Sequence, residues 1–194
     1  MHFPGGKSGV TIGPGYDMKR RAEQEIYNDM ITIGVSKEDA EIIKLGKGLM
    51  HGKAKKFVND NKNKIKPLTK FQKIMLFKLI WKSIYYPGTK NIYSTIPKKV
   101  FEKDIDILNI KDSKQSWDKT KWEDLDNKII DIIVDLNYQG AFLKRIPLQY
   151  ASSKNDPIYL ANCIACYDDL VAYDKKNRKR IPYLKGEFNG PKNF

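Results

Sequence analysis

Glycine and proline crowd into the start of the chain, in the stretch GGKSGVTIGPGYD that covers residues 5–17. This density of glycine and proline excludes a helix in the stretch, because both residue types destabilise helix interiors. The alternating run Val10–Ile12 predicts a short strand, and the turn residues Gly13-Pro14-Gly15 predict a β-hairpin around it. Residues 1–18 are therefore expected to form a small β element whose polar side chains are presented beside a tight turn.

The residues Gly6-Lys7-Ser8 also resemble the end of a phosphate-binding loop, which is the alternative explanation of these glycines. Such a loop has the pattern G-x-x-x-x-G-K-[ST] between a strand and a helix. Its first glycine would fall on Met1, and no later segment has the pattern of a parallel sheet. We therefore expect no nucleotide binding.

From Lys19 onward, apolar residues recur with helical spacing. A helix is predicted over residues 20–33, and further helices follow over 36–45, with Ser36 as its cap, and over 53–61. Thr69 and Gln72 form a capping box before a helix that runs through Ile84 and stops before Pro87. Its apolar residues lie on nearly every face, which makes it the candidate central buried helix.

Two more long helices are predicted. One covers residues 122–137, and the other has Asp156 as its cap and Pro157 at its first position and runs through Val171. The last segment, from residue 175, is basic and then loop-like. The predicted fold class is α+β and mostly helical. At 194 residues the chain is expected to form one domain, in which 1–18 is the hairpin element and 19–194 a helical lobe.

The net charge of +13 is spread through the whole chain. A basic surface attracts polyanions, namely nucleic acid, acidic lipid or an anionic cell wall. No apolar run is long enough for a transmembrane helix, and Met1–Arg21 contains no apolar core of a signal peptide. Membrane insertion is therefore not expected.

The two cysteines, Cys163 and Cys166, form a C-x-x-C pair inside a helical pattern. A zinc site needs about four ligands, and neither His2 nor His51 has ligand spacing to the pair. The expectation is two small buried helix residues, with no metal and no cofactor. A second cluster, the acidic line Asp124, Asp131 and Asp135, is interpreted as a solvated helix face.

The hairpin turn places Thr11 on one side and Asp17 on the other. A hydroxyl and a carboxylate brought together in this way can hold a water molecule, which is useful in glycoside hydrolysis. The alternative is structural: Thr11 is a strand residue, and Asp17 is the N-cap of a helix that begins near Met18. Spacing alone leaves both open.

The stretch SGVTIGPGYDM, residues 8–18, resembles a motif of the lysozyme-like muramidases of the pesticin type. Related domains stand at the C-termini of type VI secretion spike proteins and, more distantly, in phage-type lysozymes. Three further stretches are similar to the family's helix opening, its Y-x-x-G helix end and its closing N-R-R helix: PLTKFQ at 67–72, DLNYQG at 135–140 and NRKR at 177–180. The resemblance implies a lysozyme-like fold with Thr11 and Asp17 in the active site.

The resemblance also implies a glutamate as general acid, upstream of the threonine. Only ten residues precede Thr11, and none of them is acidic. Three explanations are open. The chain lacks an N-terminal segment, or it keeps the fold only for binding, or the order is permuted and the C-terminal Glu187 supplies the acid.

The function implied is a muramidase that cleaves the β-1,4 bond between N-acetylmuramic acid and N-acetylglucosamine. Such a bacteriolytic hydrolase is expected as an antibacterial effector or bacteriocin-like toxin, secreted or injected into the periplasm or wall of a target bacterium. The expected partners are peptidoglycan and an immunity protein. The alternatives are an inactive wall-binding protein and a basic nucleic-acid-binding module; no nucleic-acid recognition motif supports the latter.

Overall fold

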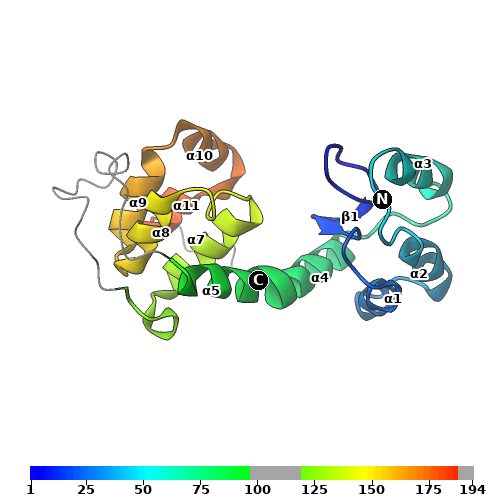
Figure 1. Ribbon diagram of the computed structural model, residues 1–194, viewed down its shortest axis with the longest axis horizontal. Coiled ribbons are helices and arrows are strands. Elements are labelled where there is room, and N and C mark those ends of the chain that lie inside the picture. Colours follow the sequence, from blue (N-terminus) through cyan, green and yellow to red (C-terminus); the bar gives the residue numbers. More distant parts are fainter. Residues whose placement is uncertain (97–118, 188–194) are drawn as a thin grey trace. The chain divides into compact units, whose positions relative to one another are not determined.

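The computed structural model describes residues 1–96 and 119–187. The chain divides into two compact units, residues 1–83 and 84–194. The protein is mostly helical and carries one small N-terminal hairpin in the part described, as predicted (Figure 1). Each unit has buried apolar residues of its own. The expectation of one domain over residues 1–194 stays a prediction.

The first unit begins with the hairpin, formed by β1 (Thr11–Ile12) and β2 (Tyr16–Asp17). The strands are antiparallel, with Thr11 opposite Asp17 and Ile12 opposite Tyr16. On the other edge of β1, the main chains of His2 and Thr11 exchange two hydrogen bonds of 2.8 and 2.9 Å. The predicted hairpin is confirmed.

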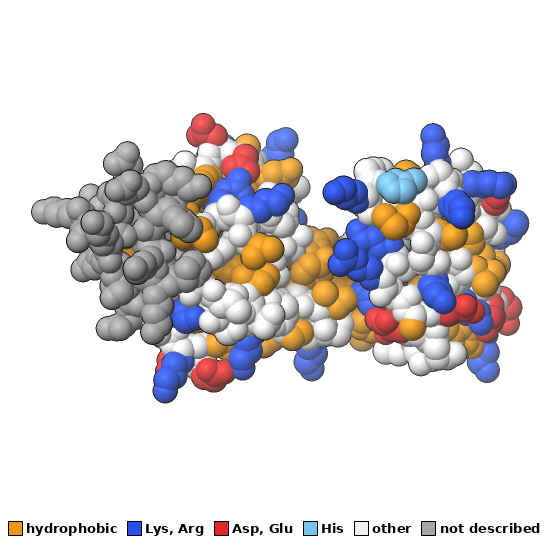
Figure 2. Space-filling model, viewed as in Figure 1, with side chains coloured by type: hydrophobic (Ala, Val, Ile, Leu, Met, Phe, Trp, Pro, Cys, Tyr) orange, Lys and Arg blue, Asp and Glu red, His pale blue; other side chains and the backbone are white. Residues whose placement is uncertain are grey.

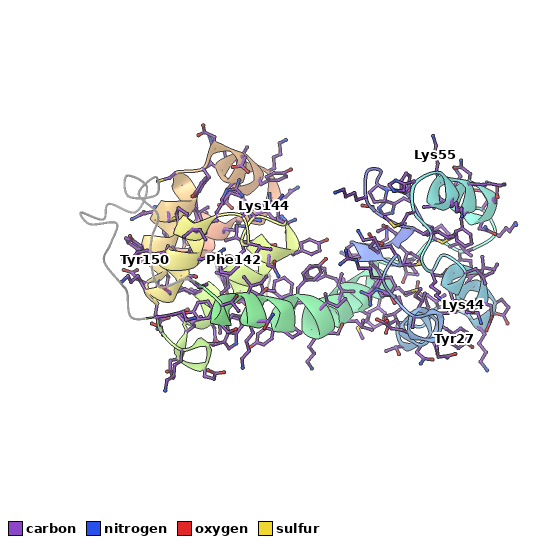
Figure 3. The ribbon with its side chains drawn as sticks, viewed as in Figure 1. Tyr27, Lys44, Lys55, Phe142, Lys144 and Tyr150 are labelled. Carbon is purple, nitrogen blue, oxygen red and sulfur yellow. The ribbon has the colours of Figure 1, made fainter. Side chains whose placement is uncertain are left out.

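Four helices complete the first unit: α1 (Glu23–Thr32), α2 (Lys37–Lys44), α3 (His51–Asn61) and α4 (Lys70–Ile80). The predicted capping box at the start of α4 is confirmed, since Thr69 and Gln72 exchange hydrogen bonds of 2.9 and 3.1 Å. Tyr27 of α1 lies beside Lys44 of α2, whose ammonium is 5.6 Å from the ring centroid (Figure 3). The buried core combines hairpin and helix residues: Val10, Ile12, Tyr16, Met18, Ile26, Met30, Ile43 and Leu76.

The helix expected to be buried on nearly every face differs from the prediction. In α4 only Leu76 and Ile80 are buried, while Phe71 is 67% exposed. The helix also does not stop before Pro87. It continues through a π-helical turn, η1 (Trp81–Tyr85), into α5 (Tyr86–Ser94). Proline has no N–H to donate, and the wider turn before Pro87 accommodates that lost bond.

The second unit contains α5 and a series of short helices. They are η3 (Trp122–Asp124), α7 (Asn127–Tyr138), α8 (Ile146–Ser153), α9 (Pro157–Ala165), α10 (Asp168–Tyr173), η4 (Asp174–Arg178) and α11 (Arg180–Leu184). Phe142, labelled in Figure 3, is fully buried. It shares the core with apolar residues from four helices: Ile129, Ile133, Leu136, Leu148, Leu160, Ile164 and Leu184.

Several predicted boundaries in the second unit move. The helix predicted from residue 122 begins at Asn127, where Asp126 caps it. The helix that starts at Pro157 has the predicted cap, because Asp156 accepts hydrogen bonds from two main-chain N–H groups, but it ends at Ala165. Helices η4 and α11 occupy most of residues 174–184, where the loop-like prediction is wrong, and residues 188–194 lie outside the described part of the chain. Within residues 1–96 and 119–187, no helix has the length and apolar character to cross a membrane.

Candidate active site in the hairpin

The hairpin turn brings the two predicted site residues of the first unit directly opposite each other. Gly13 and Gly15 have φ angles of +56° and +91°, which side-chain-bearing residues rarely adopt, so the turn depends on glycine. The main-chain N–H of Met18 donates to Val10 one pair further along the ladder. Since hydrogen-bonded and non-bonded pairs alternate in an antiparallel ladder, Thr11 and Asp17 form the closer, non-bonded pair on one face.

The two side chains of this pair differ in exposure. Thr11 is 3% exposed, and its hydroxyl donates to the carbonyl oxygen of Gly9 at 3.3 Å. The Asp17 side chain is 28% exposed, so part of its carboxylate faces solvent. The pair therefore offers a buried hydroxyl and an accessible carboxylate side by side.

Local donors hold the Asp17 carboxylate in place. Both of its oxygens accept the main-chain N–H of Gly9 at 3.2 Å, and one accepts the N–H of Lys19 at 2.9 Å. The Lys19 ammonium lies 3.6 Å away and also donates to the carbonyl of Lys7. This arrangement of Gly9, Asp17 and Lys19, here called the Asp17 cradle, fixes the orientation of the carboxylate without burying it.

The cradle needs glycine at position 9. A Cβ built there would lie 2.7 Å from Lys19 Cβ, 2.8 Å from an Asp17 carboxylate oxygen and 2.9 Å from the carbonyl oxygen of Leu49. All three distances are shorter than real Cβ contacts, and two of the three atoms belong to the cradle itself. Gly9 belongs to the motif SGVTIGPGYDM, but no pattern in the sequence indicates that its N–H binds Asp17.

The alternative interpretation of Asp17, as the N-cap of a helix that begins near Met18, is wrong. The first helix, α1, begins at Glu23 with Ala22 as its N-cap, and no helix starts at Met18. Residues 18–21 are turn, and the Asp17 side chain binds the N–H two residues ahead instead of capping a helix. Helix capping therefore does not account for the aspartate at position 17.

A second set of residues behind the hairpin was not expected. The fully buried Tyr16 donates its hydroxyl to an Asp29 carboxylate oxygen at 2.5 Å. The Arg21 guanidinium lies over the Tyr16 ring at 3.9 Å and pairs with Glu25 at 2.6 Å. Burial, together with the bond to Asp29, raises the pKa of Tyr16 above its usual range. The i, i+4 spacing of Arg21 and Glu25 could have indicated their ion pair from the sequence. No sequence pattern indicates that the Tyr16 hydroxyl is buried against Asp29.

The third predicted site residue, Glu187, belongs to the other unit of the chain. Glu187 follows α11 in the second unit, is exposed, and donates its main-chain N–H to Pro182 at 2.9 Å. Thr11 and Asp17 belong to the first unit. The structure thus brings two of the three predicted residues together within one unit, and a role for Glu187 stays a prediction.

The second unit holds a partly buried ionic cluster, formed by residues of the segments DLNYQG and NRKR. Asp135 accepts hydrogen bonds from Arg178 and, at 2.6 Å, from Arg180, which is 0% exposed. Arg180 also donates to Gln139, while Asp174 accepts the main-chain N–H of Arg180 at 2.9 Å. The segments DLNYQG and NRKR are therefore in direct contact. The interpretation as a solvated face holds for the exposed Asp124 and is wrong for Asp135. Asp131 is exposed but accepts the Tyr183 hydroxyl at 2.6 Å, and partial burial raises the pKa of its carboxyl.

The cysteine prediction is half right. Cys163 is buried in α9, whereas Cys166 follows the helix end and is exposed, and neither forms a disulfide. Among residues 1–96 and 119–187, no group of three or more His, Cys, Asp or Glu side chains is placed to hold a metal ion.

A family model covers most of the chain, matching residues 1–169, and it is described as a domain of unknown function (DUF8812). No curated protein and no solved structure matches the chain.

Proposed function

The chain belongs to the DUF8812 family, whose function is unknown, and from the hairpin geometry we propose that it is a peptidoglycan muramidase with a lysozyme-like fold. The observation that carries the proposal is the Thr11–Asp17 pair, in which a buried hydroxyl stands opposite a held but accessible carboxylate. The substrate bond is the β-1,4 link between N-acetylmuramic acid and N-acetylglucosamine.

In the proposed reaction, Asp17 acts at the anomeric carbon. Its carboxylate, with Thr11 beside it, orients the attacking water or stabilises the positive charge of an oxocarbenium-like transition state. The cradle leaves Asp17 ready for this role, since the N–H groups of Gly9 and Lys19 fix the carboxylate before substrate arrives. A second carboxyl group must protonate the leaving oxygen, and Glu187 is the candidate.

Two further observations support the proposal. The motifs DLNYQG and NRKR, which resemble the muramidase family, meet in one ionic cluster, as parts of one motif set would. In addition, Lys and Arg side chains are scattered over the first unit on the face shown in Figure 2, which suits an anionic wall. The role in an antibacterial toxin or type VI effector, and an immunity protein as partner, are part of the same proposal.

The test is digestion of purified peptidoglycan, with the soluble products identified by mass spectrometry. Fragments with a reducing muramic acid end are expected. Asp17→Asn should lower the rate by about 100-fold or more, because a general-base or charge-stabilising group contributes that much. Asp60→Asn, at an exposed carboxylate paired with Lys56 in the same unit, is the matched control and should keep full activity.

Glu187→Gln addresses the general acid in the same assay. Loss of activity in this variant, with Glu123→Gln unaffected, would assign the acid to Glu187; Glu123 is an exposed glutamate of the same unit. Full activity of Glu187→Gln would remove Glu187 from the mechanism.

A wall-binding protein without activity is the second candidate. One observation favours it: both oxygens of the Asp17 carboxylate bind main-chain N–H groups, as a purely structural carboxylate also would. This candidate predicts that the protein sediments with peptidoglycan and releases no fragments, and that Asp17→Asn sediments equally well.

A further inference from the structure

We propose that Arg21 is the positioning residue of the Asp17 site, an inference that rests on the proposed function and assigns Arg21 no contact with the sugar. The strand that carries Asp17 is only two residues long. Such a short hairpin has little stability of its own in water, so the orientation of Asp17 must be set by groups outside the ladder.

Arg21 holds the hairpin from behind through two neighbouring residues. Its Nε donates to the main-chain carbonyl oxygen of Asp17 at 3.2 Å. Its guanidinium carbon lies 3.9 Å from the centroid of the Tyr16 ring, within the range of a cation–π contact. One side chain therefore fixes the main chain of Asp17 and the ring of the residue before it, while the cradle fixes the carboxylate.

Arg21 is itself held by α1. Its Nη1 lies 2.6 Å from a Glu25 carboxylate oxygen and 3.8 Å from an Asp29 oxygen, one helical turn further on. The same Asp29 oxygen accepts the Tyr16 hydroxyl. Arg21 and Tyr16 therefore both connect β2 with α1, and their contacts share the Asp29 carboxylate. A rotation of the Asp17 main chain would disturb these contacts together.

The geometry requires arginine in particular. A planar guanidinium donates along two directions at once, from Nε to one oxygen and from Nη1 to another, whereas a lysine ammonium is a single point of charge. The Arg21 side chain is 10% exposed and lies between protein groups. It is therefore placed to act through Asp17, and the expected effect of changing it falls on kcat with little change in KM.

The neighbouring Arg20 supplies a matched control, because it is exposed. Arg21→Lys is expected to lower kcat on peptidoglycan by about tenfold or more at nearly unchanged KM, since small misplacement of a reacting group is costly. Arg20→Lys should leave both constants unchanged. Full kcat in a folded Arg21→Lys protein would overturn the proposal.

A second readout needs no activity. Hydrogen exchange of the Gly9 amide reports the bond to the Asp17 carboxylate directly. In Arg21→Lys the Gly9 amide should exchange faster while the amides of α2 are unchanged, and Arg20→Lys should match the parent. Unchanged Gly9 exchange in Arg21→Lys would contradict the positioning role.

The two readouts separate the two proposals. If the parent protein releases no fragments, the muramidase proposal fails, and the Gly9 exchange alone decides whether Arg21 orients Asp17. If Arg21→Lys does not fold, Glu25→Gln provides the decision, because it loosens Arg21 from α1 without touching β2. Faster Gly9 exchange in Glu25→Gln supports the role, and parent-like exchange overturns it.

Discussion

Asp17 in the first unit and Asp135 in the second are held in opposite ways. The Asp17 carboxylate accepts main-chain N–H groups from residues two and eight positions away and stays 28% exposed. The Asp135 carboxylate binds two arginine side chains that lie 43 and 45 positions further along the chain, and it is 17% exposed. A carboxylate held by local main chain remains available for chemistry, whereas one shared by the buried Arg180 and the partly exposed Arg178 joins distant segments.

The comparison predicts that the largest loss of stability follows a change at Asp135. Asp135→Asn should lower the free energy of unfolding by about 3 kcal/mol, because it leaves the buried Arg180 without its charged partner. Urea unfolding followed by circular dichroism measures the loss. Asp169→Asn removes an exposed partner of Arg145 and should cost under about 1 kcal/mol. Equal losses of unfolding free energy in Asp135→Asn and Asp169→Asn would show that Asp135 contributes no more than an exposed carboxylate.

A smaller loss is expected where the cradle is disturbed. Gly9→Ala should cost about 2 kcal/mol, because its Cβ has no room between Lys19, Asp17 and Leu49. The control is Gly52→Ala in α3, where a Cβ would meet nothing within 4 Å. That variant should be neutral or stabilising by up to about 1 kcal/mol, since alanine is the better helix former. Thermal unfolding of both proteins under the same conditions tests the prediction, and a Gly9→Ala protein as stable as Gly52→Ala would contradict it.

The smallest effect is expected from the titration of Tyr16, which changes stability only at alkaline pH. Burial and the bond to Asp29 raise the pKa of Tyr16, so the folded protein keeps a proton that the unfolded chain releases near pH 10. The stability due to this proton is complete below about pH 10 and is lost as the pH rises further.

Tyr16→Phe removes the titrating group and should flatten the alkaline fall in stability. Urea unfolding at a series of pH values from 8 to about 11.5, on both proteins, measures the difference. Tyr27→Phe, a change of the same kind within α1, serves as the control. Parallel pH profiles for Tyr16→Phe and the parent would show that the phenol of Tyr16 does not contribute.

The same contrast explains what the sequence could predict. The hairpin and the opposition of Thr11 and Asp17 follow from local patterns, since glycine turns and strand alternation act over a few residues. The caps at Ser36, Thr69 and Asp156 were equally readable. Such features depend on neighbours in sequence, and the structure confirms them.

The features that the sequence could not predict are of two kinds. Some depend on residues far away in the chain, and others are local main-chain arrangements that no residue type indicates. The pairing of Asp135 with Arg178 and Arg180 needs the tertiary fold, so Asp135 looked like a solvated residue. The passage of the helix through Pro87 was missed because a π-helical turn replaces the expected break. The bond from Gly9 to Asp17 was missed because a glycine offers no side chain to suggest a contact.

The cradle also has a consequence for the history of the family. Positions 9 and 17 share one volume, so a side chain at position 9 and a carboxylate at position 17 compete for the same space. A member that keeps the aspartate therefore needs glycine at position 9, whereas loss of the aspartate alone leaves Lys19 and Leu49 still in the way of a Cβ there. Across DUF8812 sequences, aspartate at position 17 should thus occur only together with glycine at position 9, while that glycine can also persist in members without the aspartate.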